Sequence, residues 1–146
     1  MKRMLVFGAV MLAACGGDSS GPSLPQVAGT YSLSQSNIAG SGVSCNALGT
    51  TMTLTQNGGT FSGTYSGGTI TCTGPGGQFS DALGNGAVAN GTVNENGAVA
   101  FDLDTQDWHL LGNVSGTSMS GTATVRLNLT GSGVQTFTGS WSAARR

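Results

Sequence analysis

The feature that most constrains the fold is an alternation of apolar and hydroxyl side chains, which recurs along most of the chain after Val27. Successive side chains of a strand point to opposite faces, so this period of two predicts strands with one buried and one solvated face. Glycine pairs and Asn-Gly sequences, which favour tight turns, separate the runs. The clearest runs are residues 30–34, 51–55, 61–66, 69–73, 99–104, 118–127 and 136–142.

The runs predict an all-β fold. No stretch predicts an amphipathic helix of useful length, because glycine and β-branched threonine interrupt every candidate. We count about nine short strands in hairpin order. They are expected to form an antiparallel up-and-down meander of about eight or nine strands that closes into a small barrel. Closure removes the edges on which Thr-rich strands would aggregate, and a β-sandwich is the alternative.

A short pattern of glycine, hydroxyl, aromatic and hydroxyl residues occurs at 29–32, 63–66 and 139–142. In each copy the glycine and the aromatic residue lie on the same face of the strand. The glycine lets the strand bend there and makes room for a neighbouring aromatic ring. This pattern resembles avidin-like and lipocalin-like small barrels. The resemblance implies a lumen that could take a small apolar ligand, whereas the polar set by which avidins hold biotin is not seen. Candidate ligand contacts are Tyr31, Tyr65, Phe101 and Trp141, and the alternative is that these side chains form the core.

The first fifteen residues predict export. Lys2 and Arg3 precede an apolar run over residues 4–14, which is too short to span a bilayer and is typical of a secretory signal. Residues 12–15, Leu-Ala-Ala-Cys, resemble the lipobox of bacterial lipoproteins. That resemblance implies a diacylglycerol on Cys15 and cleavage of the chain before it.

The predicted domains follow from this processing site: a lipoprotein signal peptide at 1–14, a flexible lipid-anchored tether at 15–26 and one β-barrel domain at 27–146. Several acyl chains, palmitate included, anchor a protein stably to a membrane without inserting it. In the resembled family an aspartate after the cysteine can signal inner-membrane retention. Gly16 stands there, so we expect a cell-envelope protein held to the outer membrane, at its periplasmic face or at the cell surface. A freely secreted protein is the alternative.

With Cys15 lipidated, Cys45 and Cys72 remain as an even pair in an exported chain. Such a pair is more often bridged than free, so we expect a disulfide. A zinc site would require closely spaced cysteines and further ligands.

Charge excludes one class of partner. Charged residues make up 8% of the chain, with five Lys and Arg against six Asp and Glu, and removal of Lys2 and Arg3 leaves three arginines. Nucleic-acid binding requires several cations on one face, so no nucleic-acid partner is expected.

The densest polar group lies at Asp102, Asp104, Asp107 and His109. The three aspartates are weak candidates for a calcium site. Calcium takes six to eight oxygen ligands, and no suitably spaced loop of the sequence supplies the others. His109 has outward parity, which favours a surface imidazole over a general base. Asn90, Asn113 and Asn128 lie in N-glycosylation sequons, which a bacterial lipoprotein is not expected to use.

The resulting functional expectation is a membrane-anchored, non-catalytic structural or interaction module of the cell envelope. An enzyme would gather nucleophile, base and stabilising cation in one cleft, and the mature chain has one histidine, three arginines and no lysine. We expect no cofactor. The partner is the membrane through the lipid anchor, with an envelope protein or a small apolar ligand as further candidates. The alternative is an apolar-ligand-binding barrel, followed by a calcium-binding module and a hydrolase.

Overall fold

The structure is a computed structural model that describes residues 23–103, 107–129 and 133–146, without the side chains of residues 127–129. The predicted signal peptide, Cys15 and most of the predicted tether therefore lie outside the described residues. In the described ranges, no helix is long and apolar enough to cross a membrane. The strands are β1 (Gly29–Gly40), β2 (Val43–Asn57), β3 (Thr60–Ser66), β4 (Thr69–Gly74), β5 (Gly77–Ala82), β6 (Asn85–Val93), β7 (Ala98–Leu103), β8 (Trp108–Ser115), β9 (Ser118–Leu129) and β10 (Gly133–Arg145).

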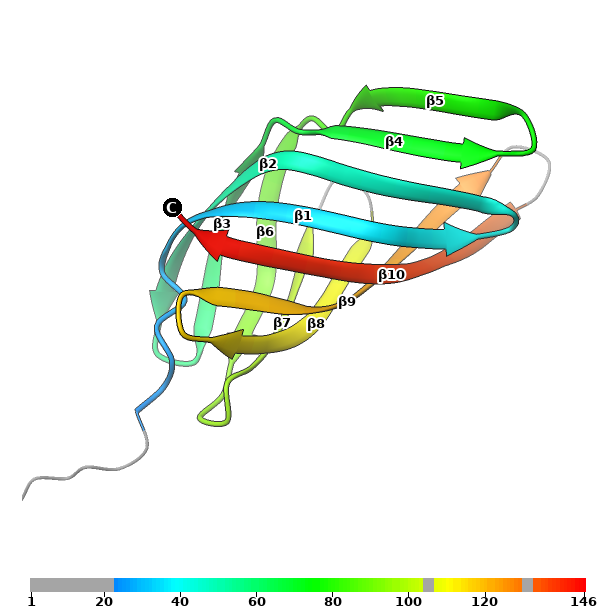
Figure 1. Cartoon of the computed structure of the whole chain (residues 1–146). Helices are drawn as coiled ribbons and strands as arrows, with labels where there is room; N and C mark the ends of the chain where they lie inside the picture. Colours follow the sequence, from blue (N-terminus) through cyan, green and yellow to red (C-terminus); the bar gives the residue numbers. More distant parts are fainter. Residues whose placement is uncertain (1–22, 104–106, 130–132) are drawn as a thin grey trace, which may run out of the picture.

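Eight of these strands form a closed antiparallel barrel. The ring runs β1-β10-β9-β8-β7-β6-β3-β2, and β2 pairs with β1 to close it (Figure 1). The predicted all-β, antiparallel barrel is confirmed. Closure gives each of the eight strands two neighbours, although the end of β9, residues 126–129, extends past β8 and pairs with β10 alone.

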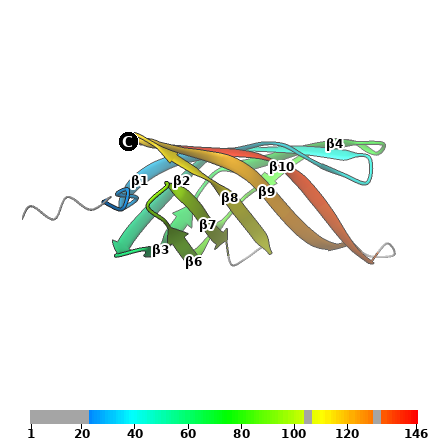
Figure 2. The ribbon, with the colours of Figure 1, turned by 90° about the horizontal axis from the view of Figure 1, so that it is seen from below.

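The hairpin β4–β5 lies outside the ring and interrupts the predicted meander. β3 pairs with β6, while β4 pairs with the first half of β2, Ser44–Leu48. The second half of β2, Thr51–Asn57, pairs with β3. β2 is 15 residues long, which is enough to serve both neighbours along one edge. We call residues 36–48 and 69–82 the extension, because they continue the sheet beyond the barrel (Figures 1 and 2).

The core fills the inside of the barrel, as the alternation predicts. On β7 the inward residues Val99, Phe101 and Leu103 are buried, and the intervening Ala100 and Asp102 are partly exposed. Large side chains from across the ring meet there. Those with less than 2% exposure include Tyr31, Leu33, Met52, Phe101, Leu110 and Met119.

Glycine allows two strand backbones to approach beneath the core rings. Gly112 of β8 is paired directly with Gly121 of β9. A Cβ atom on Gly121 would lie 1.9 Å from the carbonyl oxygen of Leu111, and one on Gly112 would lie 2.8 Å from Cζ2 of Trp141. Side chains at these two positions would force the strands apart.

The N-terminal segment and the C-terminus meet at one end of the barrel. The guanidinium of Arg145 donates to the carbonyl oxygens of Gln26 and Ala28 at 2.9 and 3.0 Å, and to the Tyr31 hydroxyl at 2.9 Å. Val27 is fully buried, and its N–H donates to Oε1 of Gln56. Residues 23–28 therefore lie at this end, which we call the anchor end because the predicted tether precedes them, while the β4–β5 turn lies at the opposite end (Figure 1).

Candidate functional site

The four aromatic residues suggested as ligand contacts are part of the packed interior. Tyr31, Tyr65, Phe101 and Trp141 are each no more than 2% exposed. The Phe101 ring meets Trp141 edge to face at a centroid distance of 5.1 Å and Phe61 at 5.7 Å. Indole Nε1 of Trp141 donates to the Leu111 carbonyl at 3.0 Å. The Phe101 ring thus contacts both Phe61 and Trp141 in the lumen, and all four suggested contact residues are buried.

Two polar side chains, Gln35 and Thr50, are buried in the barrel, and Gln35 is the one that lacks hydrogen-bond partners among the described residues. Gln35 of β1 is 1% exposed and lies opposite Trp141 and Ala47 on the two neighbouring strands. Neither Oε1 nor Nε2 of its amide has a hydrogen-bond partner among the described residues. A buried amide without partners costs free energy, so Gln35 marks a polar position in the barrel interior.

The two cysteines of the barrel domain are joined as predicted. Cys45 on β2 and Cys72 on β4 form a disulfide, with their Cα atoms 4.0 Å apart. The two residues are direct partners in the β2–β4 ladder. The bond therefore fastens the β4–β5 hairpin to a strand of the ring.

A polar row crosses the outer face of β6, β7 and β8. The strand register places Asp102 of β7 opposite His109 of β8, and His109 opposite Thr124 of β9. Asn90 of β6 reaches the row through a bulge, where its φ is +53°. The sequence gives no sign that Asn90 lies beside Asp102 and His109.

Asp102 holds the row together. Its Oδ1 accepts the Nδ1–H of His109 at 2.5 Å, and its Oδ2 accepts the Nδ2–H of Asn90 at 2.8 Å. The side chains of His109 and Asp102 are 54% and 30% exposed. The pair borders a hollow of about 450 Å³ whose other lining residues are Leu103, Asp107, Trp108, Thr124 and Arg126.

The carboxyl of Asp102 is held in its ionised form. Burial raises its pKa, but hydrogen bonds from Asn90 and His109, with the charge of His109, lower it by more. The pKa of Asp102 therefore lies below its ordinary value. The negative charge orients the imidazole, as a carboxylate does in many acid–base pairs.

This geometry gives little support to metal binding. Both carboxylate oxygens of Asp102 already accept protein hydrogen bonds, while Asp104 lies outside the described residues and Asp107 is exposed. In residues 23–103, 107–129 and 133–146, no three His, Cys, Asp or Glu side chains gather as metal ligands. Nor does His109 make a hydrogen bond to a hydroxyl within those ranges, which a Ser- or Thr-dependent hydrolase would use.

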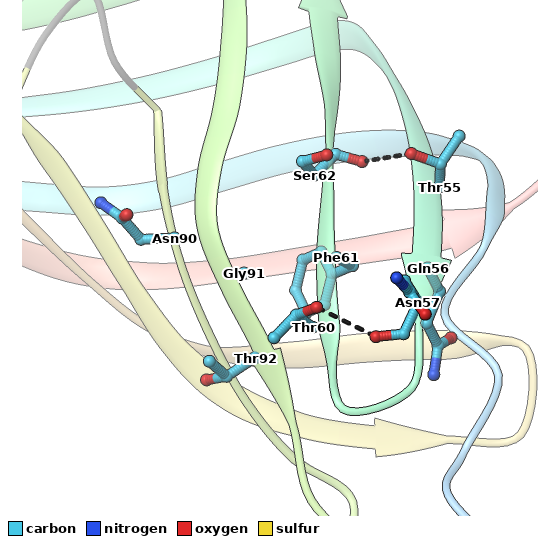
Figure 3. A pocket seen from close by; sticks show the side chains of 9 residues that line it. All are labelled: Thr55, Gln56, Asn57, Thr60, Phe61, Ser62, Asn90, Gly91 and Thr92. Atoms are coloured by element: carbon cyan, nitrogen blue, oxygen red, sulfur yellow. Dashed lines mark hydrogen bonds between the residues drawn. The ribbon is translucent and has the colours of Figure 1, made fainter.

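A second, larger hollow of about 650 Å³ lies on the outer face of β2, β3 and β6 (Figure 3). Hydroxyl and amide side chains surround it, and Phe61 and Gly91 form its floor on the barrel side. Asn90 borders this hollow and bonds Asp102 of the first, so one residue joins both. Its lining residues are Thr55, Gln56, Asn57, Thr60, Phe61, Ser62, Asn90, Gly91 and Thr92.

Comparison with known proteins adds no family. The chain matches no protein-family model, and it has no significant match among curated proteins or solved structures. The candidate sites therefore stand on geometry alone.

Sequence reasoning named Asp102 and His109 but missed their partners. The sequence marked Asn90 only as part of an N-glycosylation sequon. It marked Thr124 and Arg126 only as outward-facing residues of the predicted strand at 118–127. The missing information is the pairing of β6 with β7 and of β8 with β9. Pattern within one strand does not encode which strand lies next to it.

Proposed function

We propose that the chain is a lipid-anchored, non-catalytic module of the bacterial cell envelope that acts through the outer surface of its barrel. The packed lumen, in which the Phe101 ring contacts both Phe61 and Trp141, supports the part of this proposal that excludes a ligand carrier. The non-catalytic part rests on the composition of the mature chain, which has one histidine, three arginines and no lysine. A barrel of eight strands is just wide enough for its own side chains or one small ligand. Here the chain's own side chains occupy that width.

The anchoring part rests on the Leu12–Cys15 sequence and on the position of the anchor end. Residues 23–28 run along the end where Arg145 contacts Gln26 and where Gln56, at the border of the larger hollow, bonds Pro25 and Val27. The hollow beside Asp102 and the extension lie away from these contacts, so a domain held in this way keeps both available to partners.

A labelling experiment tests the anchor. Expressed in a lipoprotein-competent bacterium with labelled palmitate, the chain is expected to take up label and to fractionate with outer membranes. Cys15→Ala is expected to lose both properties, while Ser19→Ala, a matched change in the tether, keeps them. Label retained by Cys15→Ala would refute lipidation at this residue.

A binding experiment tests the packed lumen. Both tryptophans are buried, Trp108 at 3% and Trp141 at 2% exposure, so an apolar ligand entering the lumen would change their fluorescence. We expect no saturable change and no rise in melting temperature with fatty acids or an apolar dye. Saturable binding that Trp141→Phe weakens would replace this proposal by the carrier function.

One observation favours that second candidate, a barrel for a small ligand. The unpartnered amide of Gln35 could bind a polar group on an otherwise apolar molecule. If such a ligand exists, thermal stabilisation by it should disappear in Gln35→Leu, which keeps the volume of the side chain and removes its hydrogen-bonding atoms.

A further inference from the structure

β5 is the terminal strand of the sheet in the described residues, and its outer edge is open. Each strand of the ring has two neighbouring strands, and β4 is paired on both sides, but β5 has β4 as its sole neighbour. All six residues of β5 are exposed. Phe79 is 58% exposed although it lies on the same face as the buried Cys72, its partner on β4.

The register identifies which backbone groups point away from the sheet. The N–H of Leu83 donates to the carbonyl of Gly68 on the β4 side at 3.0 Å. Hydrogen-bonded pairs alternate along an antiparallel ladder, so Phe79, two pairs further along, also directs its backbone groups to β4. The short Cα distance between Cys45 and Cys72 agrees, because it marks a pair whose backbone groups point outward to the next strands. Gln78 and Ser80 therefore point their N–H and C=O groups to the open edge.

The open stretch is short and has a definite end. The next outward N–H, that of Ala82, is already bound by the Asp81 carboxylate at 2.8 Å. At the other end, Pro75 and Gly76 form the turn to β4. What remains is centred on Phe79, with one outward residue on either side.

We propose that this edge pairs antiparallel with β5 of a second copy of the chain, about a two-fold axis at Phe79. Gln78 would lie opposite Ser80 of the other copy, and the pair of strands would gain four N–H to C=O hydrogen bonds. The two Phe79 rings would face each other at a non-hydrogen-bonded position, where side chains are closest. No outward backbone group of Gln78 or Ser80 is left without a partner.

Charge also favours this occupant. Asp81 is the one charged residue of β5 and would lie opposite Gly77 of the other copy, so the two carboxylates do not meet. The disulfide holds β4 to the ring and thereby fixes the edge before association. A contact of one short strand pair is smaller than a standard interface of about 1,200–2,000 Å², so the dimer is weak and reversible. The inference rests on the strand register and not on the lipid anchor.

Sedimentation equilibrium tests the association. The full chain carrying Cys15→Ser, which removes the lipid and the free thiol, is expected to pass from monomer to dimer between about 10 μM and about 1 mM. Adding Ser80→Pro removes an outward N–H and is expected to weaken dimerisation by at least about tenfold. The control is Ser80→Ala. Like the proline variant it loses the hydrogen bond between the Ser80 and Thr71 hydroxyls, but it keeps the backbone N–H, so it is expected to dimerise like the parent.

Disulfide trapping tests the register independently. Gln78→Cys and Ser80→Cys, each in the Cys15→Ser chain, are mixed under mild oxidation. The mixture is expected to form a cross-linked heterodimer, since the two positions face each other at about 5.5 Å, within disulfide range. Each variant alone is expected to cross-link far more slowly. Equal cross-linking of single variants and mixture, or none in either, overturns the two-fold pairing. A chain that stays monomeric at about 1 mM also overturns it, and leaves the edge to a strand from a different protein.

Discussion

Trp141 illustrates how one side chain of this barrel joins several strands. It lies on β10, packs its ring against Phe101 of β7, and donates from Nε1 to Leu111 of β8. Gly112 beneath the ring has no Cβ, and an added one would lie 2.8 Å from Cζ2. The ring therefore fits because a neighbouring strand lacks a side chain.

Removing this ring should destabilise the barrel strongly. Trp141→Ala leaves a cavity among β7, β8 and β10 and removes the indole hydrogen bond to the Leu111 carbonyl, for an expected loss of about 3–5 kcal/mol. Urea unfolding followed by circular dichroism measures it. Leu48→Ala is the control, because Leu48 is 61% exposed and its truncation should cost less than about 1 kcal/mol.

Replacing Gln35 is expected to change the unfolding free energy in the opposite direction. Gln35→Leu keeps the size of the side chain and removes two buried polar atoms that lack partners. Unfolding free energy is expected to stay unchanged or to rise by about 1 kcal/mol. A loss greater than about 1 kcal/mol would mean that the amide has a favourable partner in solution.

The pH dependence of stability should report the Asp102 pair. The pKa of Asp102 is lower in the folded chain than its ordinary value, so the folded state favours the ionised carboxyl. Its contribution is present above the ordinary aspartate pKa and is lost as pH falls through the lowered folded value. The stability difference between the parent and Asp102→Asn should therefore be larger at neutral pH than in acid. Solvent exposure keeps this difference below about 1 kcal/mol, and Asp81→Asn on an exposed strand is the control.

At the scale of the elements, alternation predicts the strands that have one wet face and one dry face. Residues 61–66 and 99–104 are examples, and the structure places Phe61, Tyr65 and Phe101 inside the barrel. β5 was not predicted because both of its faces are exposed, so no alternation in burial is required of its sequence. The detour of β4–β5 outside the ring could not be predicted either. It depends on β2 being long enough to pair with two successive strands along one edge.

The disulfide should act mainly on the hairpin that it fastens. Replacing both Cys45 and Cys72 by Ser removes a cross-link whose loop entropy corresponds to about 3 kcal/mol. Melting temperature is expected to fall. Hydrogen exchange should accelerate most in β4 and β5. Among the described residues, this hairpin is joined to the barrel by the disulfide and by the β2–β4 ladder. Equal acceleration in β8 and β9 would show that the cross-link supports the ring as a whole.

At the scale of the whole molecule, Arg145 joins the two ends of the described chain. Its guanidinium bonds two carbonyls of the N-terminal segment and lies over the Tyr31 ring, with Cζ 5.4 Å from the centroid. The hydrogen bonds to Gln26, Ala28 and Tyr31 all come from Nη2, and a lysine ammonium lacks both that nitrogen's position and the planar group that lies over the Tyr31 ring. Arg145→Lys is thus expected to lower the unfolding free energy by about 1–2 kcal/mol. Arg146→Lys, at an exposed neighbouring position, should have a smaller effect in the same urea titration.

The meeting of the two ends has a mechanical consequence. If the proposed lipid anchor holds the chain, tension between that anchor and a partner bound at the extension enters through residues 23–28 and runs along β1. Because β1 is paired on one side with β10 and on the other with β2, that force acts parallel to the strand and perpendicular to its hydrogen bonds. Such shear loads both ladders at once instead of opening them one bond at a time. The barrel should resist a pull through its N-terminal segment far better than one that peels β5 from its edge.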